Sequence, residues 1–395
     1  MTEILKEMLS KLENKFQYEL TRLHEMAARL VAAFFTRFPF LLKKSPTKDL
    51  LLLPYYPRGN VGTRVRFEIY RPFLEEDGVT YDIEYVADLD EMYDAFYCPH
   101  HARHTAERFR FMRRFLWSRL LVCLRASEYR AIYVQRAMIP SFPHLKSAFL
   151  MKLMARLNDN ITLDFYDADY LSNPELVYSS VKYADKLSVV NEVLKDHFAP
   201  MHQSIHVHPL ALSAKPYKVK ETYDISSPIR LFWTGTHGHL RNFEACIEAL
   251  RLLNSKHDFT MVLITDGVKE YEGFPIERHR YDTSTFYDIM VSCDIGVFPV
   301  LRGDDEHRGA MAMKTLEYMA AGLPVVGAPW GLSPYLEENE SILIATTTED
   351  WCAALERTFS DKSLREKLGR NARKVYENHH ESKVSYLTLK KILLG

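Results

Sequence analysis

The sequence predicts an α/β protein built from two doubly wound parallel-sheet domains, with an appended N-terminal amphipathic helical segment. Two series of short apolar runs alternate with helical stretches, which is typical of parallel strands joined by crossover helices. A stretch with several prolines and little hydrophobic pattern lies between the two series. The length of 395 residues fits two to three domains at roughly 150 residues each.

These observations divide the chain into five parts: a helical extension (1–46), a first α/β domain (47–214), a linker (215–228), a second α/β domain (229–375) and a C-terminal helix (376–395). The expected strands of the first domain are 50–54, 81–86, 131–135, 161–165, 187–190 and 205–208, and those of the second are 230–234, 259–265, 294–299, 324–327 and 342–345. Two such domains in tandem make a cleft, and ligands bind beyond the carboxyl ends of the strands.

The composition excludes several classes of protein. With 51 Lys and Arg against 52 Asp and Glu, the formal net charge is -1, which argues against a dedicated nucleic-acid binder. The five cysteines are far apart and form no CxxC pair, so we expect a reducing compartment and no zinc site. The most apolar stretch, 26–35, is too short to cross a bilayer. We therefore expect a cytoplasmic protein, either free or bound peripherally to the inner face of the cytoplasmic membrane.

The first 46 residues hold apolar side chains at spacings of three and four, which predicts an amphipathic helix or a pair of helices. Two interpretations stay open. In one, the helix packs on the body of the protein or on a second subunit, giving a homo-oligomer. In the other, residues 22–44 lie on a membrane surface, because basic side chains flank a group of phenylalanines. The basic residues are Arg29, Arg37, Lys43 and Lys44, and the phenylalanines are Phe34, Phe35, Phe38 and Phe40.

A second basic and aromatic segment, 100–130, allows a similar pair of interpretations. A helix of this composition fits contact with anionic headgroups or with a phosphorylated acceptor. A helix packed in the core, with its arginines facing water, explains the same composition equally well.

The segment 293–337 carries the most chemical information. A buried strand leads into the loop LRGDDEHRG, which delivers Arg308 and Gly309 to the start of a helix that stops at Gly322. Free backbone N–H groups and the helix dipole favour a phosphate at such a place. Lys314 lies about one turn inside the helix, and Glu317 follows on the same face, so that a cation can meet a diphosphate and a carboxylate can meet sugar hydroxyls. The alternative is a surface Lys–Glu pair.

The first strand of the second domain ends in a second candidate phosphate loop. It runs through Gly235, Thr236, His237 and Gly238 and opens a helix that contains Arg241. Glycines at a strand-to-helix turn let the backbone approach a phosphate closely, although an ordinary tight turn explains them as well.

The arrangement K-x-x-E-Y-M-A-A-G-x-P-V-V in the helix and strand from Lys314 resembles the donor-binding segment of GT-B glycosyltransferases, specifically the retaining enzymes of glycosyltransferase family 4. The resemblance covers residues 49–390. The R-G pair before the helix and the lysine within it resemble the variant associated with enzymes of bacterial surface polysaccharides. It implies two Rossmann-like domains, an acceptor domain followed by a nucleotide-sugar domain, with the C-terminal helix crossing back to the first. Lys314, Glu317 and Arg241 become the catalytic residues, with Glu317 at the ribose.

The chain departs from the family pattern at two positions. The family places two glutamates eight positions apart in the donor loop, and the first of them falls at Gly309 here. An arginine that neutralises the diphosphate in the family falls at Thr236, whereas Arg241 matches the neighbouring lysine position. Lys314 and Arg308 are the candidates to replace the lost positive charge.

The acceptor side follows from the same resemblance. The loop PRGNVG resembles the family's first glycine-containing loop, so Gly59, Asn60 and Gly62 are expected to offer N–H groups and Arg64, together with Arg66, to meet an acceptor phosphate. The stretch YVQRAMIP places Gln135 and Arg136 at the cleft edge by the same likeness.

Two D-x-D pairs, Asp88 with Asp90 and Asp167 with Asp169, suggest a competing interpretation as the metal motif of GT-A glycosyltransferases. Such pairs are common by chance and often cap turns. Because the two Rossmann-like halves favour GT-B, we expect no metal and no other cofactor beside the nucleotide-sugar donor.

The function implied by the resemblance is retaining transfer of a sugar from a nucleotide-sugar donor to a glycan or lipid-linked acceptor, in bacterial cell-surface polysaccharide or glycoconjugate biosynthesis. Two alternatives stay open. One is a catalytically degenerate GT-B-like protein that binds a sugar nucleotide or a partner. The other is a GT-B epimerase or hydrolase acting on a nucleotide sugar.

Overall fold

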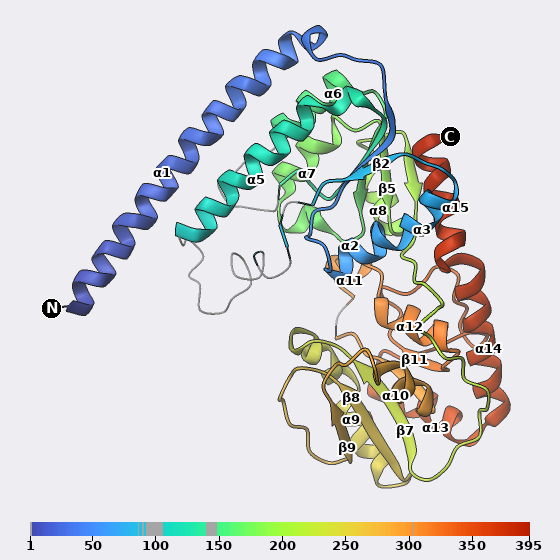
Figure 1. The fold of residues 1–395 in the computed structure, drawn as a ribbon. Helices are drawn as coiled ribbons and strands as arrows, with labels where there is room; N and C mark the ends of the chain where they lie inside the picture. The colour runs from blue at the N-terminus through green and yellow to red at the C-terminus, as the bar shows by residue number, and fades with distance from the viewer. Residues whose placement is uncertain (1, 86, 89–90, 92–105, 140–147, 302) are drawn as a thin grey trace. The chain divides into compact units, whose positions relative to one another are not determined.

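The computed structural model describes residues 2–85, 87–88, 91, 106–139, 148–301 and 303–395 (Figure 1). The chain forms two compact units, the first made of Met1–His208 with Leu387–Gly395 and the second of Pro209–Tyr386. Each unit contains one six-stranded sheet in which every pairing is parallel. The predicted α/β class with two parallel sheets is confirmed.

The sheet of the first unit has the strand order β2-β1-β3-β4-β5-β6. The last four residues of β1 are buried leucines, as expected for a strand covered on both faces. The strands are β1 (Lys48–Leu53), β2 (Tyr81–Ile83), β3 (Tyr129–Gln135), β4 (Ile161–Phe165), β5 (Lys186–Val189) and β6 (Ile205–Val207). The helices between them are α2 (Val61–Arg66), α3 (Arg71–Glu76), α5 (Ala106–Leu124), α6 (Ala148–Leu157), α7 (Pro174–Val181) and α8 (Glu192–Phe198).

The sheet of the second unit has the order β12-β11-β10-β7-β8-β9. Its strands are β7 (Ile229–Thr234), β8 (Phe259–Ile264), β9 (Ile276–His279), β10 (Ile295–Phe298), β11 (Val325–Gly327) and β12 (Leu343–Ile344). Its helices are α9 (Leu240–Asn254), α10 (Phe286–Ser292), α11 (Asp305–Arg308), α12 (Met313–Ala321), α13 (Thr348–Ser360) and α14 (Lys362–His379). A last helix, α15 (Ser382–Leu394), begins in the second unit and ends in the first, where Lys186 Nζ donates to the carbonyl of Ile392 at 2.7 Å.

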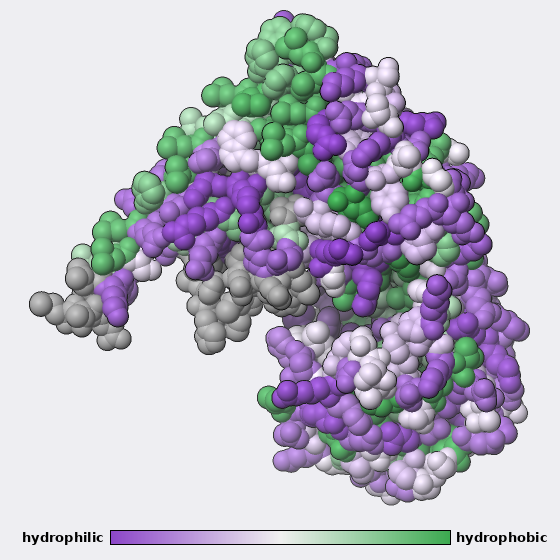
Figure 2. Space-filling model, viewed as in Figure 1, coloured by the Kyte–Doolittle hydropathy of each residue, from purple (hydrophilic) through white to green (hydrophobic). Residues whose placement is uncertain are grey.

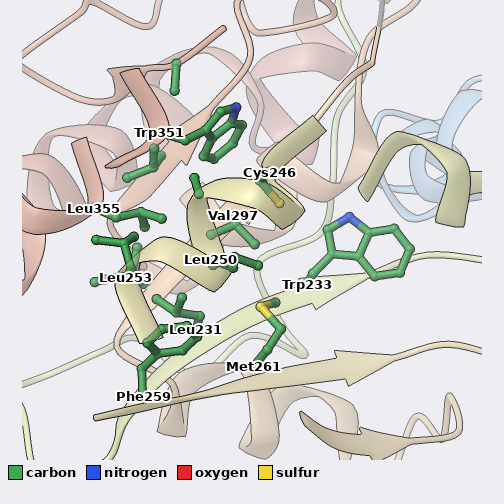
Figure 3. Close-up of a cluster of buried hydrophobic side chains, with 14 of the residues drawn as sticks. Leu231, Trp233, Cys246, Leu250, Leu253, Phe259, Met261, Val297, Trp351 and Leu355 are labelled. Atoms are coloured by element: carbon green, nitrogen blue, oxygen red, sulfur yellow. The ribbon is translucent and has the colours of Figure 1, made fainter. Parts of the chain in front are cut away.

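Two hydrophobic cores hold the second unit together, one on each face of its sheet. Successive strand residues point to opposite faces, so Leu231 and Trp233 of β7 enter one core while Phe232 enters the other. Figure 3 shows the first of these cores, to which β7, β8, β10, α9 and α13 all contribute. Trp351 of α13 is fully buried in it.

The order of the strands creates a switch point in each sheet. β7 comes first along the chain in the second unit; β8 and β9 lie on one side of it and β10, β11 and β12 on the other. The crevice at such a reversal, beyond the carboxyl ends of the strands, is where open α/β sheets bind ligands. The equivalent reversal in the first unit lies between β1 and β3.

The N-terminal segment is one uninterrupted helix, α1 (Thr2–Arg37), which packs against α5 and α6 of the first unit (Figure 1). Arg113 of α5 donates to Gln17 Oε1 at 2.6 Å, and Trp117 Nε1 donates to His24 Nδ1 at 2.8 Å. Most of the large apolar side chains of α5 are buried. For residues 106–124 the structure therefore shows a helix packed within the first unit, but not with every arginine facing water, because Arg119 is buried and donates to the carbonyls of Glu84 and Pro54. Residues 100–105 lie outside the described residues. None of the described helices is long and apolar enough to span a membrane.

A close backbone approach joins α12 to α14 at Gly369. A Cβ atom there would lie 2.5 Å from Tyr223 Cε1 and would also meet the carbonyl oxygen of Gly322. We expect Gly369→Ala to lower the free energy of unfolding of the second unit by about 1–3 kcal/mol, because overpacking outweighs alanine's better helix propensity. Calorimetric melting measures this change. Lys374→Ala on the exposed side of α14 is the control, and a Gly369→Ala variant more stable than wild type would contradict the packing described.

Candidate functional site

The switch point of the second unit brings two helix N-termini together. β7 and β10 are parallel neighbours with Leu231 opposite Ile295, so their carboxyl ends meet at one edge of the sheet. β7 leads through a short turn into α9, and β10 leads through the loop that contains α11 into α12. Neither α9 nor α12 has a side-chain cap at its N-terminus. The N-terminal ends of two helices, each the positive end of its dipole, therefore lie on the same edge, an arrangement suited to an anion. A 3₁₀ turn, His237–His239, precedes α9 and already uses the N–H groups of His239 and Leu240.

Lys314 is half-buried between these two helix starts. Its Nζ lies 5.8 Å from the centre of the Trp233 ring, and its Cε lies 3.0 Å from the position that a Cβ on Gly235 would occupy. Within the described parts of the chain, Lys314 Nζ has no hydrogen-bond or ion-pair partner. Burial lowers its pKa from 10.5 to about 8, although the charge of Glu317 opposes the shift. The site thus holds a lysine whose positive charge is incompletely compensated.

The perturbed pKa of Lys314 gives a prediction for anion binding. Above about pH 8 the side chain loses its proton in the free protein, so affinity for a diphosphate is expected to fall there. A bound anion favours the charged form, so binding near pH 8 takes up a proton. Calorimetric titrations in two buffers of different ionisation enthalpy measure this uptake. Binding with no proton uptake in that range would place the anion away from Lys314.

The same pKa has an effect on folding with a definite sign. The unfolded chain keeps the Lys314 proton up to the ordinary pKa of 10.5, whereas the folded chain releases it at about 8. Between these values the unfolded state binds more protons, so this group's contribution to stability rises with pH. Lys314 is therefore a residue that lowers stability at neutral pH.

Glu317 lies three residues after Lys314 and is half-buried in α12. Its Oε1 accepts a hydrogen bond from Tyr217 OH at 3.5 Å. Tyr217 packs edge-to-face on Tyr287, with ring centres 4.9 Å apart, so aromatic residues support this hydrogen bond. The carboxylate is held on the side of α12 that also carries Lys314.

The turn after β7 is held in shape by its own hydrogen bonds. The backbone N–H of His237 donates to Asp266 Oδ1 at 2.6 Å, and Thr236 Oγ1 lies 2.9 Å from His239 Nδ1. Gly235 leaves the space that the Trp233 ring needs, because a Cβ there would lie 2.7 Å from that ring. The predicted glycine is therefore required by the structure, and the His237 N–H is already used by Asp266.

Burial lowers the pKa of His239 to about 4, with Lys314 and Arg241 adding repulsion. His239 is thus neutral at pH 7 and leaves the positive charge of the site to lysine and arginine. Neither His239 nor Asp266 is predicted from the sequence. The only signals for them are a carboxylate at the end of a strand and a turn rich in histidine.

The loop after β10 is fastened to α9. Asp304 Oδ1 accepts from His307 Nδ1 at 2.6 Å and from the His307 N–H at 3.1 Å. His307 Nε2 lies 3.3 Å from Asn242 Nδ2 of α9. Neither Asn242 nor His307 was singled out from sequence, since their contact joins residues 65 positions apart.

Two arginines border the site. Arg241 and Arg308 are exposed, and the charge of Arg241 acts on both His239 and Asp304. Gly309 is buried at the end of the loop, and Thr236 and Gly238 are exposed in the facing turn. The structure therefore gathers all eight predicted donor residues with Arg241 on one edge of the second unit: Gly235, Thr236, His237, Gly238, Arg308, Gly309, Lys314 and Glu317.

The equivalent edge of the first unit is filled by its own side chains. Gln135 is fully buried; its Nε2 donates to the Gly62 carbonyl at 3.2 Å and its Oε1 accepts from the Tyr55 N–H at 2.8 Å. Asn60 caps α2 by accepting from the Gly62 N–H at 2.8 Å. The N–H of Asn60 itself donates to the carbonyl of Pro57 at 3.3 Å. The expectation that these N–H groups are offered to a ligand is therefore wrong for Asn60 and Gly62. Gly59 takes a positive φ of 89°, and Arg64 is exposed.

Arg136 follows β3 in the left-handed region, with φ of 59°. It forms ion pairs with Asp167 and Asp169, and its guanidinium lies 4.5 Å from the centre of the Tyr166 ring. Burial raises the pKa of Asp169 to about 6, against the effect of Arg136. Both carboxylates of this D-x-D pair are thus ion-paired to Arg136 within the first unit. Asp90 of the other D-x-D pair lies outside the described residues. No group of three metal-ligating side chains is present among the residues that the structure describes.

Arg66 corrects a further expectation. Its side chain is fully buried and forms an ion pair with Asp164 of β4, with Nε donating to Oδ2 at 3.0 Å. It also donates to the His208 carbonyl at 2.9 Å and to Tyr133 OH at 3.1 Å. The predicted contact with an acceptor phosphate is therefore wrong for Arg66, which is a structural residue.

Comparison with known proteins agrees with this architecture. Residues 241–389 match the model of a family described as glycosyl transferase-like. A search of curated proteins found no match. Sucrose-phosphate synthase from Thermosynechococcus elongatus is similar, with a TM-score of 0.61 and 12% identity over 88% of this chain and 98% of that one. HepE of Anabaena, solved with UDP and glucose, gives a TM-score of 0.58 and 11% identity over 88% and 99%. A glycosyltransferase from Rickettsia africae gives 0.60 and 14% over 88% and 100%.

The two parallel-sheet units, each with a switch point in its strand order, define a doubly wound α/β protein. The family match covers this edge from Arg241 onward, and the fold of the whole chain is that of the GT-B glycosyltransferases. The fold is thus the one that the sequence resemblance predicts, and residues 241–389 are glycosyl transferase-like.

Proposed function

We propose that the protein transfers a sugar from a nucleoside-diphosphate sugar to a glycan or lipid-linked acceptor with retention of the anomeric configuration. The observation that supports this best is the half-buried Lys314 beside two uncapped helix N-termini at the β7–β10 switch point. A diphosphate carries charge on two adjacent phosphates, so two helix starts with a lysine between them complement it. The Anabaena neighbour solved with UDP makes a uridine nucleotide the first donor to try.

Each donor residue has a proposed role. Lys314 and Arg241 bind the diphosphate. Arg308 supplies the positive charge that the family places at the position of Thr236 in this chain. Thr236 and Gly238 let the backbone approach a phosphate, Gly235 leaves room for the Trp233 ring beside Lys314, and His237 holds the turn through Asp266. Glu317, fixed by Tyr217, binds ribose hydroxyls, and Gly309 replaces the family's first glutamate.

The proposed reaction is a same-face displacement. The acceptor hydroxyl forms a bond to the anomeric carbon while the bond to the diphosphate oxygen breaks, and the departing diphosphate takes the acceptor proton. As the bond to the diphosphate oxygen breaks, the sugar becomes oxocarbenium-like. The protein contributes position and fixed positive charge at the leaving group. We propose that the positive side chains and helix ends meet this charge without a metal, so that chelators leave the rate unchanged.

We assign the acceptor to the first unit, with Gly59 and the exposed Arg64 as the residues that meet it. Gln135 supports that edge by donating to the carbonyl of Gly62, and Arg136 supports it by packing on the Tyr166 ring. The proposed role of the product is in bacterial cell-surface polysaccharide or glycoconjugate biosynthesis, with the protein on the cytoplasmic side.

The test begins with a thermal-shift series of UDP, GDP, ADP and CMP and their sugar conjugates. A ligand at about a hundred times its Kd adds about 2.7 kcal/mol of stability, enough to move the melting temperature by several degrees. The stabilising donor is then incubated with glycan and lipid-linked acceptors, and proton NMR of the product reports the anomeric configuration. An inverted product would contradict the retaining mechanism. Free sugar or an epimer formed without acceptor would support a hydrolase or epimerase, and binding without any turnover a degenerate binding protein.

A further inference from the structure

The side of α1 that faces away from α5 and α6 carries an apolar stripe. Eight of its residues are exposed and recur at helical spacing: Met8, Leu9, Leu12, Phe16, Leu23, Met26, Leu30 and Phe34. At about 100° per residue these side chains lie on the face opposite Gln17, Thr21, Ala28 and Ala32, which are buried. Figure 2 shows apolar atoms along α1 and at its C-terminal end. Packing within the first unit therefore does not explain the stripe, since Leu30 remains 72% exposed.

The stripe ends in a phenylalanine cluster, formed by Phe34, Phe35, Phe38 and Phe40. The ring centres of neighbouring members lie 5.2–6.2 Å apart. Phe40 is 70% exposed, and Leu41 beside it is exposed as well. Residues 26–44 contain four basic side chains and no Asp or Glu: Arg29, Arg37, Lys43 and Lys44. The most apolar end of the helix is thus also its most positive end.

A basic cavity opens beside this cluster, between α1 and α6. Its volume is about 610 Å³, and four of its lining residues are cations: Arg29, Arg37, Lys152 and Arg156. Arg29 pairs with Glu25 and lies 4.7 Å over the Phe149 ring. The part of the chain that the structure describes offers no ion-pair partner to Arg37, Lys152 or Arg156. Three of the cations that line the cavity therefore have no carboxylate beside them among the described residues.

We propose that the outer face of α1 binds the surface of an anionic lipid bilayer, with the basic cavity holding the phosphate of an acidic lipid headgroup. The phenylalanine cluster and the stripe enter the boundary between headgroups and acyl chains, while the flanking lysines and arginines stay at headgroup level. Each basic residue near such a surface strengthens binding about fivefold, and a buried phenylalanine adds about tenfold. This inference concerns the first unit and is tested without any nucleotide. A negative result would therefore contradict membrane binding and leave the proposed sugar transfer untouched.

A second copy of the chain fits this face less well. Four acidic residues of α1 with described side chains already have partners: Glu7 with Lys11, Glu13 with Arg110, Glu19 with Arg22, and Glu25 with Arg29. Among the described side chains of α1, a symmetric pairing of two copies would thus bring no unpaired carboxylate to the cavity. Acidic lipids supply that missing negative charge.

The experiment is flotation of the full-length protein with vesicles of phosphatidylcholine alone or mixed with phosphatidylglycerol, across a salt series. Binding is expected only to the mixed vesicles and to weaken with salt, because salt screens the contribution of charge. Replacing Arg37, Lys152 and Arg156 together by Gln is expected to weaken binding about a hundredfold. Phe40→Ser is expected to weaken it about tenfold. All four side chains are removed from exposed or cavity positions, so unfolding is not expected, and melting curves check this.

Matched controls come from the second unit. Lys374→Gln removes an exposed lysine of α14, and Leu252→Ser removes an exposed leucine of α9; neither is expected to change flotation. Binding that is equal on neutral and acidic vesicles, or that survives the triple substitution, would overturn the proposal. So would a stable dimer in sedimentation that Phe40→Ser dissociates, because that result would make a second copy the occupant of the stripe.

Discussion

Lys314→Ala is expected to lower kcat/KM for sugar transfer by about 10²–10³ while the protein stays folded. The variant removes a cation held half-buried near the starts of α9 and α12, where under the proposed reaction it would meet the charge that develops on the departing diphosphate. Its melting temperature is expected to stay the same or rise, because the lysine is held at a lowered pKa in the free protein. Initial rates with the donor found by thermal shift, together with a melting curve, measure both effects.

Lys374→Ala is the matched control, since it removes an exposed lysine from α14 and is expected to turn over at the wild-type rate. Transfer by Lys314→Ala at the wild-type rate would contradict the assignment of the diphosphate site. Loss of activity together with a large drop in melting temperature would show instead that Lys314 has a structural role.

Arg66→Met is expected to lower the stability of the first unit by about 3–5 kcal/mol, because it leaves the fully buried carboxylate of Asp164 without its cation. For a unit of this size such a loss lowers the melting temperature by roughly 10 °C. Calorimetry measures it. Arg64→Met on the same short helix is the control, since Arg64 is exposed and its removal is expected to change stability by no more than about 0.5 kcal/mol.

A second substitution separates loss of the ion pair from loss of packing. Asp164→Leu added to Arg66→Met removes the stranded charge, so the double variant is expected to recover part of the stability. A double variant less stable than Arg66→Met alone, or equal stability of the Arg66 and Arg64 variants, would contradict the structural role assigned to this pair.

The alternation of apolar runs and helices was enough to predict the two sheets. Eleven of the twelve strands described lie where the sequence places them, because short apolar runs bounded by turn residues, such as Leu50–Leu53 before Pro54, favour buried strands. β9 was missed. Its four residues, Ile276–His279, are each only partly buried at the edge of the sheet, so the segment lacks the apolar run that marks the others.

The placement of the candidate donor residues at one edge of the second unit was predictable because they lie in short motifs that follow two strands. The edge of the first unit was not, since its contacts depend on distant pairs. Arg66 meets Asp164, 98 positions away, and Gln135 holds a loop 73 positions earlier. An arginine on a short helix looks the same in sequence whether it faces water or a buried carboxylate. Only the packing of β4 against β3 and β5 decides between these outcomes.

Calorimetric titration of the wild type and Lys314→Ala with the mono- and diphosphate of one nucleotide tests the central claim most directly. If the starts of α9 and α12 hold the second phosphate with Lys314, the wild type is expected to bind the diphosphate at least about tenfold more tightly than the monophosphate, since each charge-assisted contact contributes about 1.5–3 kcal/mol. The variant is expected to lose most of that preference. Equal affinity for the two nucleotides in the wild type, or a preference that survives in Lys314→Ala, would contradict the account.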